Sequence, residues 1–317
     1  MEDSELAPIV LFVYNRPRHT AKTLLYLSRN DLVDKSNLFI FADGPRVDAD
    51  KAERAKIKET RDVCRSFKSA ALVKIVESET NQGLAASITR GVGEIINRYG
   101  KIIVLEDDLE LSPQFLNYMN KALNMYAENS KVFHISGYWY PEQINTKILE
   151  QSFFYRATSC WGWGTWKDRW RKLETDPKFL MQRVRRKIFG RYRFNIQGGY
   201  DFFGHLEKNA EGTMNTWAIK WYASVFINNG LCLHPKHSYV NNFGHDGSGT
   251  NCKLDFKYRW EKLNESPSLQ KVPVIEERLA LKVVQSFFAK KRRRKLRRKV
   301  RELTPIFLKR IKRKIKR

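Results

Sequence analysis

The stretch that decides the fold is KIIVLEDDLELSP, residues 101–113. Its apolar run, residues 102–105, predicts a short buried strand, because such continuous runs are typical of parallel strands covered on both faces. Ser112 and Pro113 suit the N-cap and the first position of a following helix. Open α/β sheets bind ligands beyond the carboxyl ends of their strands, so the acids at that point are a candidate site. These acids are Glu106, Asp107 and Asp108.

The acidic stretch offers two kinds of oxygen ligand. If it is extended, alternation points Glu106 and Asp108 to one side and Asp107 to the other. One side then suits a hard cation, and the other can accept a hydrogen bond from a sugar or ribose hydroxyl. Mg²⁺ and Mn²⁺ prefer carboxylate oxygens and are often shared with substrate phosphates. The alternative is a solvated acidic loop stabilised by the helix dipole.

The chain before this stretch alternates strands with helices. Apolar runs predict strands over residues 8–14, 38–42 and 72–77. A helix is expected from Pro17, another over 49–68, and a third over 84–99, where apolar residues repeat at helical spacing. After the acids, a helix over 113–127 and a strand over 132–136 are expected. This order predicts an α/β fold with a mostly parallel, doubly wound sheet. The glycine fingerprint of dinucleotide folds is absent, which disfavours NAD and FAD.

Polar residues follow the first two strands. Asn15 and Arg16 stand between the first strand and Pro17, in the strand–loop–helix order that opens nucleotide-binding units and attracts phosphate. Asp43 ends the second strand, where it could accept hydrogen bonds from a base or a ribose. The alternative for Asp43 is a turn aspartate preceding Gly44 and Pro45.

Residues 137–170 are dense in aromatic side chains, and SCWGWGTW, residues 159–166, stands out. Tryptophans between glycines cannot all belong to the core of a helix. Indole faces can stack on sugars, and glycines let the backbone approach a ligand. We therefore expect at least one ligand contact here, with Trp161 and Gly162 as candidates. The alternative is an aromatic core of a second half-domain.

Two helices are expected beyond this stretch, over residues 200–211 and 216–228, with Asn215 placed to cap the second. The polar, glycine-rich stretch NFGHDGSGTN, residues 242–251, contains a histidine and an aspartate, His245 and Asp246. Its composition suits a lid that orders over a ligand. A plain surface loop is the alternative.

The composition excludes several classes of protein. Hydrophobic residues make up 42% of the 317, yet no apolar run approaches the ~20 residues of a membrane span. The four cysteines are widely spaced and include no CxxC pair, which indicates thiols without a function in a reducing compartment. The start, MEDSELAP, lacks the basic and apolar regions of a signal peptide, so we expect a cytoplasmic protein.

The formal charge of +25 is concentrated at one end of the chain. Residues 290–317 hold 17 Lys or Arg and one acid, +16 of the total, and the other 289 residues carry +9. Large apolar residues recur among these cations, which favours an amphipathic segment on the anionic inner face of the cell membrane. Nucleic acid is the rival partner for this charge, and a solvated tail is the third interpretation.

Several stretches resemble one family of enzymes. VLEDDLELSPQFLNYM, residues 104–119, resembles the metal-site segment of the N-acetylglucosaminyltransferase family that initiates complex N-glycans. FIFADG (39–44) and NQGLAASITRGVGEII (81–96) resemble that family's second-strand aspartate segment and the stretch before its metal-site strand. SCWGWGTWKDRW, NTWAIKW and GHDGSGTN resemble stretches of bacterial surface-polysaccharide glycosyltransferases. Over about residues 8–251 the chain thus looks like a GT-A fold nucleotide-sugar glycosyltransferase.

The resemblance implies a role for individual residues. Asp108 would be the direct ligand of Mn²⁺ or Mg²⁺, while Glu106 and Asp107 would hold the ribose or the donor sugar. A loop, residues 245–250, would close on the diphosphate. The residues that would flank the nucleobase are Asn15, Arg16 and Asp43. The other expected donor contacts are Trp161, Gly162 and His245.

The catalytic base departs from the family pattern. Families with this pattern place an Asp two residues before the helix tryptophan, where this chain has Asn215. An amide cannot take a proton from an acceptor hydroxyl at neutral pH. Asn215 then only positions the acceptor, or a nearby acid is the base, or activity is reduced. The candidate acids are Asp201, Glu211 and Asp246.

The expected reaction is metal-dependent transfer of a sugar from a UDP-linked or similar donor to a glycan or lipid-linked hydroxyl, with inversion. Its expected setting is surface polysaccharide or lipopolysaccharide synthesis. A sugar-phosphate nucleotidyltransferase is the second enzyme hypothesis, and a nucleic-acid-binding protein acting through the tail is the non-enzymatic one. The expected parts are a nucleotide-sugar-binding half, an acceptor-side half of the same domain, and a membrane-associating tail: residues 1–136, 137–273 and 274–317.

Overall fold

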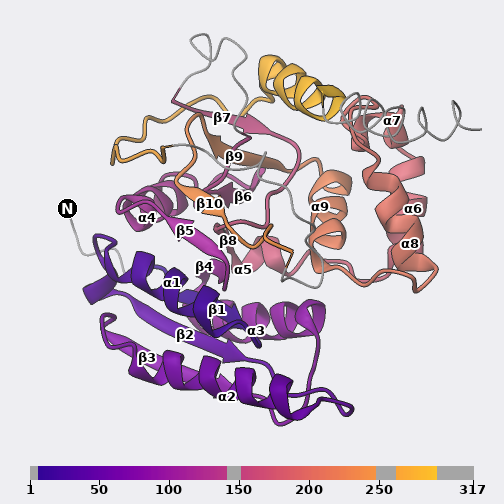
Figure 1. The fold of residues 1–317 in the computed structure, drawn as a ribbon. Helices are drawn as coiled ribbons and strands as arrows, with labels where there is room; N and C mark the ends of the chain where they lie inside the picture. Colours follow the sequence, from indigo (N-terminus) through magenta and orange to yellow (C-terminus); the bar gives the residue numbers. More distant parts are fainter. Residues whose placement is uncertain (1–5, 141–150, 248–261, 291–317) are drawn as a thin grey trace, which may run out of the picture.

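The computed structural model describes residues 6–140, 151–247 and 262–290. At its centre is an eight-stranded sheet with the order β3-β2-β1-β4-β8-β6-β9-β7 (Figure 1). The strands of the first half are parallel, which confirms the predicted α/β class with a mostly parallel, doubly wound sheet. They are β1 (Ile9–Val13), β2 (Asn37–Ala42), β3 (Leu72–Glu77) and β4 (Lys101–Glu106).

The second half of the sheet contains mostly antiparallel pairs. β8 is antiparallel to β4 on one side and to β6 on the other, with Val104 opposite Trp163. A strand from later in the chain thus lies between two earlier ones, and both halves share one sheet. The strands of this half are β6 (Val132–Ser136), β7 (Ser152–Tyr155), β8 (Trp163–Trp166) and β9 (Leu231–Pro235).

A two-stranded antiparallel ribbon pairs β5 (Leu109–Leu111) with β10 (Val240–Asn242). The sequence predicted a helix from Pro113 with Ser112 as its N-cap. Helix α4 spans Phe115–Met125 instead, with Gln114 as N-cap, and Pro113 and Gln114 form a turn between the end of the ribbon at Leu111 and the helix.

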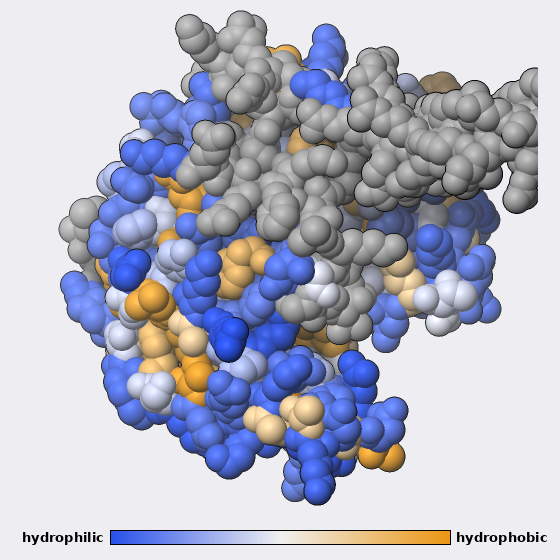
Figure 2. All heavy atoms as spheres, viewed as in Figure 1, coloured by the Kyte–Doolittle hydropathy of each residue, from blue (hydrophilic) through white to orange (hydrophobic). Residues whose placement is uncertain are grey.

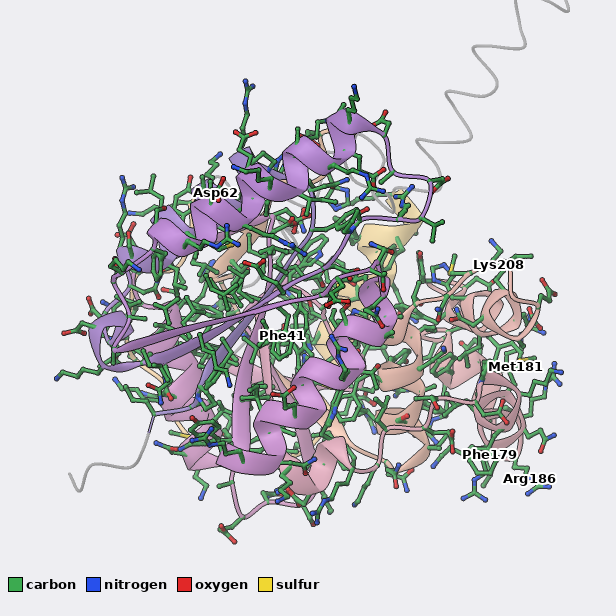
Figure 3. The ribbon with its side chains drawn as sticks, turned by 90° about the horizontal axis from the view of Figure 1, so that it is seen from below. Phe41, Asp62, Phe179, Met181, Arg186 and Lys208 are labelled. Carbon is green, nitrogen blue, oxygen red and sulfur yellow. The ribbon has the colours of Figure 1, made fainter. Side chains whose placement is uncertain are left out.

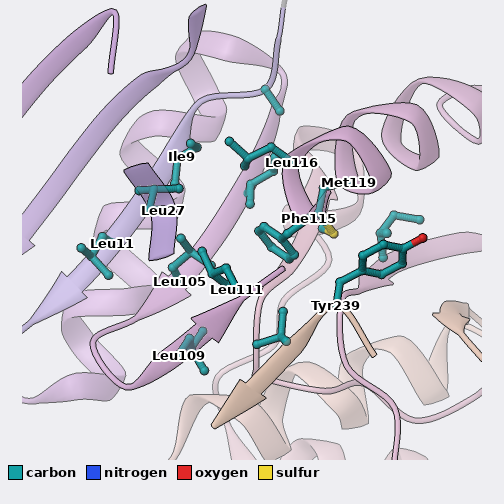
Figure 4. Packing of buried hydrophobic residues seen from close by; sticks show 14 of the residues in the cluster. Ile9, Leu11, Leu27, Leu105, Leu109, Leu111, Phe115, Leu116, Met119 and Tyr239 are labelled. Atoms are coloured by element: carbon teal, nitrogen blue, oxygen red, sulfur yellow. The ribbon is translucent and has the colours of Figure 1, made fainter. Parts of the chain in front are cut away.

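One face of the sheet is covered by α1 (Pro17–Ser28), α2 (Lys51–Ser66), the short 3-10 helix η1 (Val33–Lys35) and α4. Figure 4 shows this core from close by: Leu27 of α1 and Leu116 of α4 pack near Ile9 and Leu105 of the sheet. Leu27 and Leu116 are buried because each of these helices turns an apolar face to the sheet and a polar face to solvent. The outer surface drawn in Figure 2 is accordingly mostly hydrophilic over this half.

The other face is covered by α3 (Leu84–Tyr99), α5 (Lys167–Trp170) and α9 (Trp217–Ile227). Tryptophans stack here: the ring centroids of Trp163 and Trp217 are 5.1 Å apart, and those of Trp170 and Trp221 are 5.0 Å apart. None of these four side chains is more than 6% exposed. The tryptophans after Gly162 therefore form core, which was the alternative to ligand contact.

A third core lies among α6 (Pro177–Arg185), α7 (Gly190–Phe194), α8 (Phe202–Ala210) and the helical residues 278–290. The apolar residues of that last segment are buried against the body: Val283, Val284, Phe287 and Phe288. This part of the expected tail therefore belongs to the folded body. Residues 291–317, which carry most of the membrane prediction, lie outside the described residues. Among the described helices, none combines the length and apolar character of a membrane span.

Candidate functional site

The candidate site lies where the strand order of the sheet reverses. β1 is flanked by β2 and β4, so the connections leaving β1 and entering β4 run to opposite sides. A crevice opens beyond the carboxyl ends of the strands at such a point, and α/β proteins bind ligands there. In this chain the loop after β1 contributes residues 14–16, and the end of β4 contributes residues 106–108.

A pocket of about 410 Å³ opens at this point, a size suited to a small molecule or cofactor. Phe12 and Phe41, whose ring centroids are 5.4 Å apart, form part of its wall. The polar lining residues are Tyr14, Asn15, Arg16, Asp43, Arg46, Asn81, Ser87, Glu106, Asp107, Asp108 and Asn215.

Arg16 is paired with the acids of the turn between β4 and β5. Its Nη1 lies 2.9 Å from Asp108 Oδ2 and 3.4 Å from Asp107 Oδ1. Both carboxylates face one guanidinium because this stretch turns, so the alternation expected for an extended chain is wrong here. The Nε and Nη2 atoms of Arg16 are buried, and none of the described residues accepts a hydrogen bond from them. Two donors of Arg16 at the pocket are therefore not used by the described part of the chain.

The turn is fixed from two sides. The Thr23 hydroxyl of α1 donates a hydrogen bond to the carbonyl O of Asp107 at 2.8 Å. Asn242 Nδ2 of β10 donates to Asp108 Oδ1 at 2.9 Å. Gly244 packs so closely that a Cβ there would lie 2.0 Å from Asp108 Oδ2. The ribbon that the sequence did not predict is therefore what positions the carboxylate of Asp108.

Three acidic side chains lie together here, and one guanidinium, that of Arg16, pairs with two of them. Burial, together with the charge of Asp108, raises the pKa of Asp107 to about 7. Burial and the charges of both aspartates raise the pKa of Glu106 well above its usual range. The Oε1 atom of Glu106 is buried, and none of the described residues donates a hydrogen bond to it.

This donor set fits a hard divalent cation. Mn²⁺ and Mg²⁺ prefer carboxylate oxygens, and a buried excess of carboxylates favours a bound cation. In the described part of the chain, no three His, Cys, Asp or Glu side chains form a complete metal site. An ion would therefore be held by one of these carboxylates, with its remaining ligands from substrate or water.

Asp43 is engaged within the protein. Its Oδ1 accepts hydrogen bonds from the backbone N–H groups of Gly44 and Gln82 at 2.9 and 2.8 Å. Its Oδ2 accepts from the backbone N–H of Gly83 at 3.0 Å and from Asn81 Nδ2 at 3.1 Å. Four donors are about as many as one carboxylate accepts. Asp43 therefore holds the loop before α3 against the pocket wall, and its contact with a nucleobase stays a prediction.

Asn215 lies in the pocket lining. The sequence predicted that this residue positions the acceptor. Its Oδ1 accepts a hydrogen bond from Lys220 Nζ at 3.2 Å. Helix α9 has Thr216 as its N-cap, so Asn215 does not cap it. Asn15 also lines the pocket, on the side of β1.

Two of the candidate acids lie elsewhere. Asp201 is the N-cap of α8 and accepts a hydrogen bond from the backbone N–H of Gly204 at 3.1 Å. Glu211 ends the same helix and lines a separate groove between α8 and α6. Neither residue lines the pocket at the strand switch.

Asp246 lies on the loop after β10, also outside the pocket lining, and it contacts α1 beside Arg16. Its Oδ2 is 3.1 Å from His19 Nε2 on α1, and its charge acts on Arg16. The ring of His245 meets that of Trp161 edge to face, with centroids 5.5 Å apart. Residues 248–251 of the predicted lid lie outside the described residues.

Trp161 is half-buried, and Gly162 serves close packing. Gly162 has a φ of +60°, and a Cβ there would lie 2.8 Å from Val240 Cγ2 of the ribbon. Neither residue belongs to the lining of the pocket, and their contact with a donor stays a prediction.

Tyr14, Arg46 and Asn81 are among the polar residues of the lining for which the sequence predicted no binding role. The Tyr14 hydroxyl donates a hydrogen bond to Glu53 Oε1, and Arg46 Nε lies 3.7 Å from the same oxygen. Each of the three residues follows the carboxyl end of β1, β2 or β3. The rule that singled out the acids after β4 also applies to them.

No family model matches the chain, and no curated protein matches it. Its structure is similar to that of the mannosyltransferase PcManGT from Pyrobaculum calidifontis in complex with GDP-Man and Mn²⁺, at 11% identity over 69% of this chain and 73% of that one, with a TM-score of 0.37. It is also similar to UDP-glucose pyrophosphorylase complexed with UDP-glucose, at 10% identity over 73% and 90% of the two chains, with a TM-score of 0.35. A third similarity is to the bifunctional glycosyltransferase WbbM, at 7% identity over 66% and 38%, with a TM-score of 0.31. These are likenesses of fold alone.

Proposed function

We propose that the protein is a nucleotide-sugar glycosyltransferase. It moves a sugar from a nucleoside-diphosphate sugar, UDP-linked in our proposal, to a hydroxyl of a glycan or lipid-linked acceptor in surface polysaccharide synthesis, with inversion. The observation that supports this is the pocket at the strand switch, where Arg16 faces Asp107 and Asp108. A guanidinium binds phosphate oxygens, while carboxylates accept hydrogen bonds from sugar hydroxyls, so both parts of such a donor find partners.

Arg16 binds the diphosphate in this proposal. Its Nε and Nη2 are buried beside the acids without acceptors among the described residues. A planar guanidinium can offer both donors to one phosphate group. The ribose or the sugar is held by Glu106 and Asp107, and the nucleobase lies toward Asn15 and Asp43.

Asp108 is the proposed metal ligand. Asn242 and the close approach of Gly244 hold its carboxylate in one orientation. A divalent ion bound there would supply positive charge to the diphosphate as it leaves. The low exposure of Asp107 and Asp108, 9% and 6%, strengthens every electrostatic contact at this end of the pocket.

The acceptor side of the pocket is formed by Asn215 and bordered by the loop with Asp246. Asn215 orients the acceptor by hydrogen bonding, since its amide cannot remove a proton. Asp246 is the proposed base. Among the candidate acids it is the one that contacts His19 and whose charge acts on Arg16. Proton removal by a positioned carboxylate contributes ~10²–10⁴ in rate.

A donor screen tests the proposal. The protein is incubated with Mn²⁺ and common nucleotide sugars, and released nucleoside diphosphate is measured. Asp108→Ala should abolish metal-dependent turnover and keep the fold, while Asp34→Ala, an exposed residue on η1, should keep full rate. Full turnover of Asp108→Ala with EDTA present would contradict the metal role. Release of pyrophosphate in place of nucleoside diphosphate would identify a nucleotidyltransferase.

A further inference from the structure

Helices α6 and α7 present an apolar tip to solvent. Ile188 is 80% exposed, Phe189 76% and Tyr192 56%, and Phe179 on α6 is 43% exposed. These three aromatic residues are the exposed aromatics of the described part of the chain. In Figure 3, Phe179 and Arg186 lie at the outer rim of the molecule, far from Phe41 in the sheet. We call residues 178–193 the α6–α7 surface.

The α6–α7 surface is also strongly cationic. From Pro177 to Tyr200 the sequence contains no acid, and the surface has seven cations: Lys178, Arg183, Arg185, Arg186, Lys187, Arg191 and Arg193. Arg185 and Arg191 share one distant partner, Glu207, at 3.8 and 3.9 Å. The pKa of Lys187 is lowered by burial and by the neighbouring charges of Arg193 and Arg183, which reflects this crowding.

The scaffold beneath the tip is closely packed. Leu180, Val184 and Phe194 are fully buried, so both helices are anchored by one face. A Cβ on Gly190 would lie 1.8 Å from the carbonyl O of Val184, so the chain passes directly against α6 at this glycine. The preceding Phe189 has a φ of +49°, a conformation that bulky residues rarely adopt. The turn thus places the ring of Phe189 in solvent, where it contributes little to the stability of the fold.

We propose that the α6–α7 surface docks the protein on an anionic lipid membrane. Ile188 and Phe189 enter the headgroup region, and the surrounding cations pair with lipid phosphates. Tyrosine prefers the membrane–water interface, which suits Tyr192, and phenylalanine belongs to the apolar face that enters it, which suits Phe179. This docking does not depend on which reaction the pocket catalyses.

The C-terminal segment of the chain leads to the same side of the molecule. In Figure 1 the helix of residues 278–290, drawn in yellow, lies beside α7. Gln285 Nε2 donates to the carbonyl O of Ile196 at 3.1 Å, and the ring centroids of Phe288 and Tyr200 are 4.5 Å apart. Residues 290–317, with 17 Lys or Arg and one acid, therefore follow from a helix beside the α6–α7 surface. Repulsion between like charges disfavours this tail, or a second copy of the surface, as the group that covers the apolar tip.

Helix α8 links the surface to the pocket. α8 packs against α6, and the turn that follows α8 leads to Asn215 in the pocket lining. A lipid-linked acceptor held at the membrane would therefore approach the pocket from the side of Asn215. Nucleic acid is the rival polyanion, but exposed Ile188 and Phe189 add little to contacts with its phosphates.

Vesicle binding by the full-length chain tests the proposal. Sedimentation with vesicles of phosphatidylcholine plus phosphatidylglycerol should show binding that phosphatidylcholine alone does not give. Hydrogen exchange of residues 186–193 should slow on binding, a local signal independent of the tail. Ile188→Ser combined with Phe189→Ser should weaken binding about tenfold or more at high salt, because apolar insertion persists when charges are screened.

The matched control replaces exposed apolar residues elsewhere, Val47→Ser with Ile275→Ser, whose side chains are 96% and 70% exposed. It should bind vesicles like the wild type, and both double variants should keep the wild-type unfolding midpoint because surface changes cost little. Unchanged binding of the Ile188/Phe189 variant, or exchange protection given by duplex RNA and not by vesicles, would overturn the proposal.

Discussion

Asp246 is the residue on which the proposed proton transfer depends. Its Oδ2 lies 3.1 Å from His19 Nε2, whereas the amide of Asn215 in the pocket lining cannot remove a proton at neutral pH. We predict that Asp246→Asn lowers kcat by ~10²–10⁴ and leaves the donor KM nearly unchanged, because only transition-state proton transfer is lost. Initial rates of nucleoside diphosphate release, with the donor found by the screen, measure this.

Asp201→Asn is the matched control for that variant. Asp201 caps α8 outside the pocket lining, and Asn caps helices as well as Asp does. It should therefore keep the wild-type rate. Equal rates for Asp246→Asn and the wild type would exclude Asp246 as the base.

At the scale of single residues, the sequence predicted which residues lie at the pocket better than it predicted which residues they contact. Arg16 and Asp43 were singled out because both follow strand ends, and both line the pocket. Their partners come from distant segments: Arg16 meets Asp108, and Asp43 meets the loop of Gln82. Such pairings depend on how separate segments are packed together, which no local pattern encodes.

The turn between β4 and β5 gives a pH-dependent prediction at the scale of one element. Burial and the charge of Asp108 raise the pKa of Asp107 from 3.8 to about 7 in the folded protein. The folded state therefore binds a proton more tightly than the unfolded state does. Stability from this proton is fully present below the unfolded pKa and is lost as pH rises through about 7.

Asp107→Asn removes this titration, because an amide stays neutral at every pH. Its free energy of unfolding, relative to that of the wild type, should rise between weakly acidic and weakly basic pH in EDTA. Urea unfolding at several pH values measures the difference. Asp34→Asn on the exposed η1 should follow the wild-type curve, and a constant gap for Asp107→Asn would contradict the prediction.

Elements with strong periodicity were predicted well, and short paired elements were not. β3 at residues 72–77 and β6 at 132–136 have the predicted bounds, and α3 spans the predicted 84–99. β5 was read as part of a loop and helix start, because its three residues form a strand only through pairing with β10. The missed ribbon is also what positions Asp108.

At the scale of the whole molecule, the two halves of the sheet are interleaved. The sequence placed a change of character at residue 137 but could not show that β8 returns to lie between β4 and β6. The tryptophan-rich stretch therefore completes the hydrogen bonding of β4 and buries Ile102 and Val104 behind α3 and α9. Neither half can lose its structure without exposing the apolar face of the other.

This interleaving predicts one cooperative unfolding transition for both halves. All eight tryptophans lie after residue 138, so their fluorescence reports the second half, while hydrogen exchange of β2 reports the first. The urea midpoints of the two signals should coincide. Trp163→Ala should lower both midpoints equally. The loss in free energy of unfolding should be about 3–5 kcal/mol, because Trp163 is fully buried between the halves. Midpoints that separate, or a Trp163→Ala shift confined to the fluorescence signal, would show that the halves unfold independently.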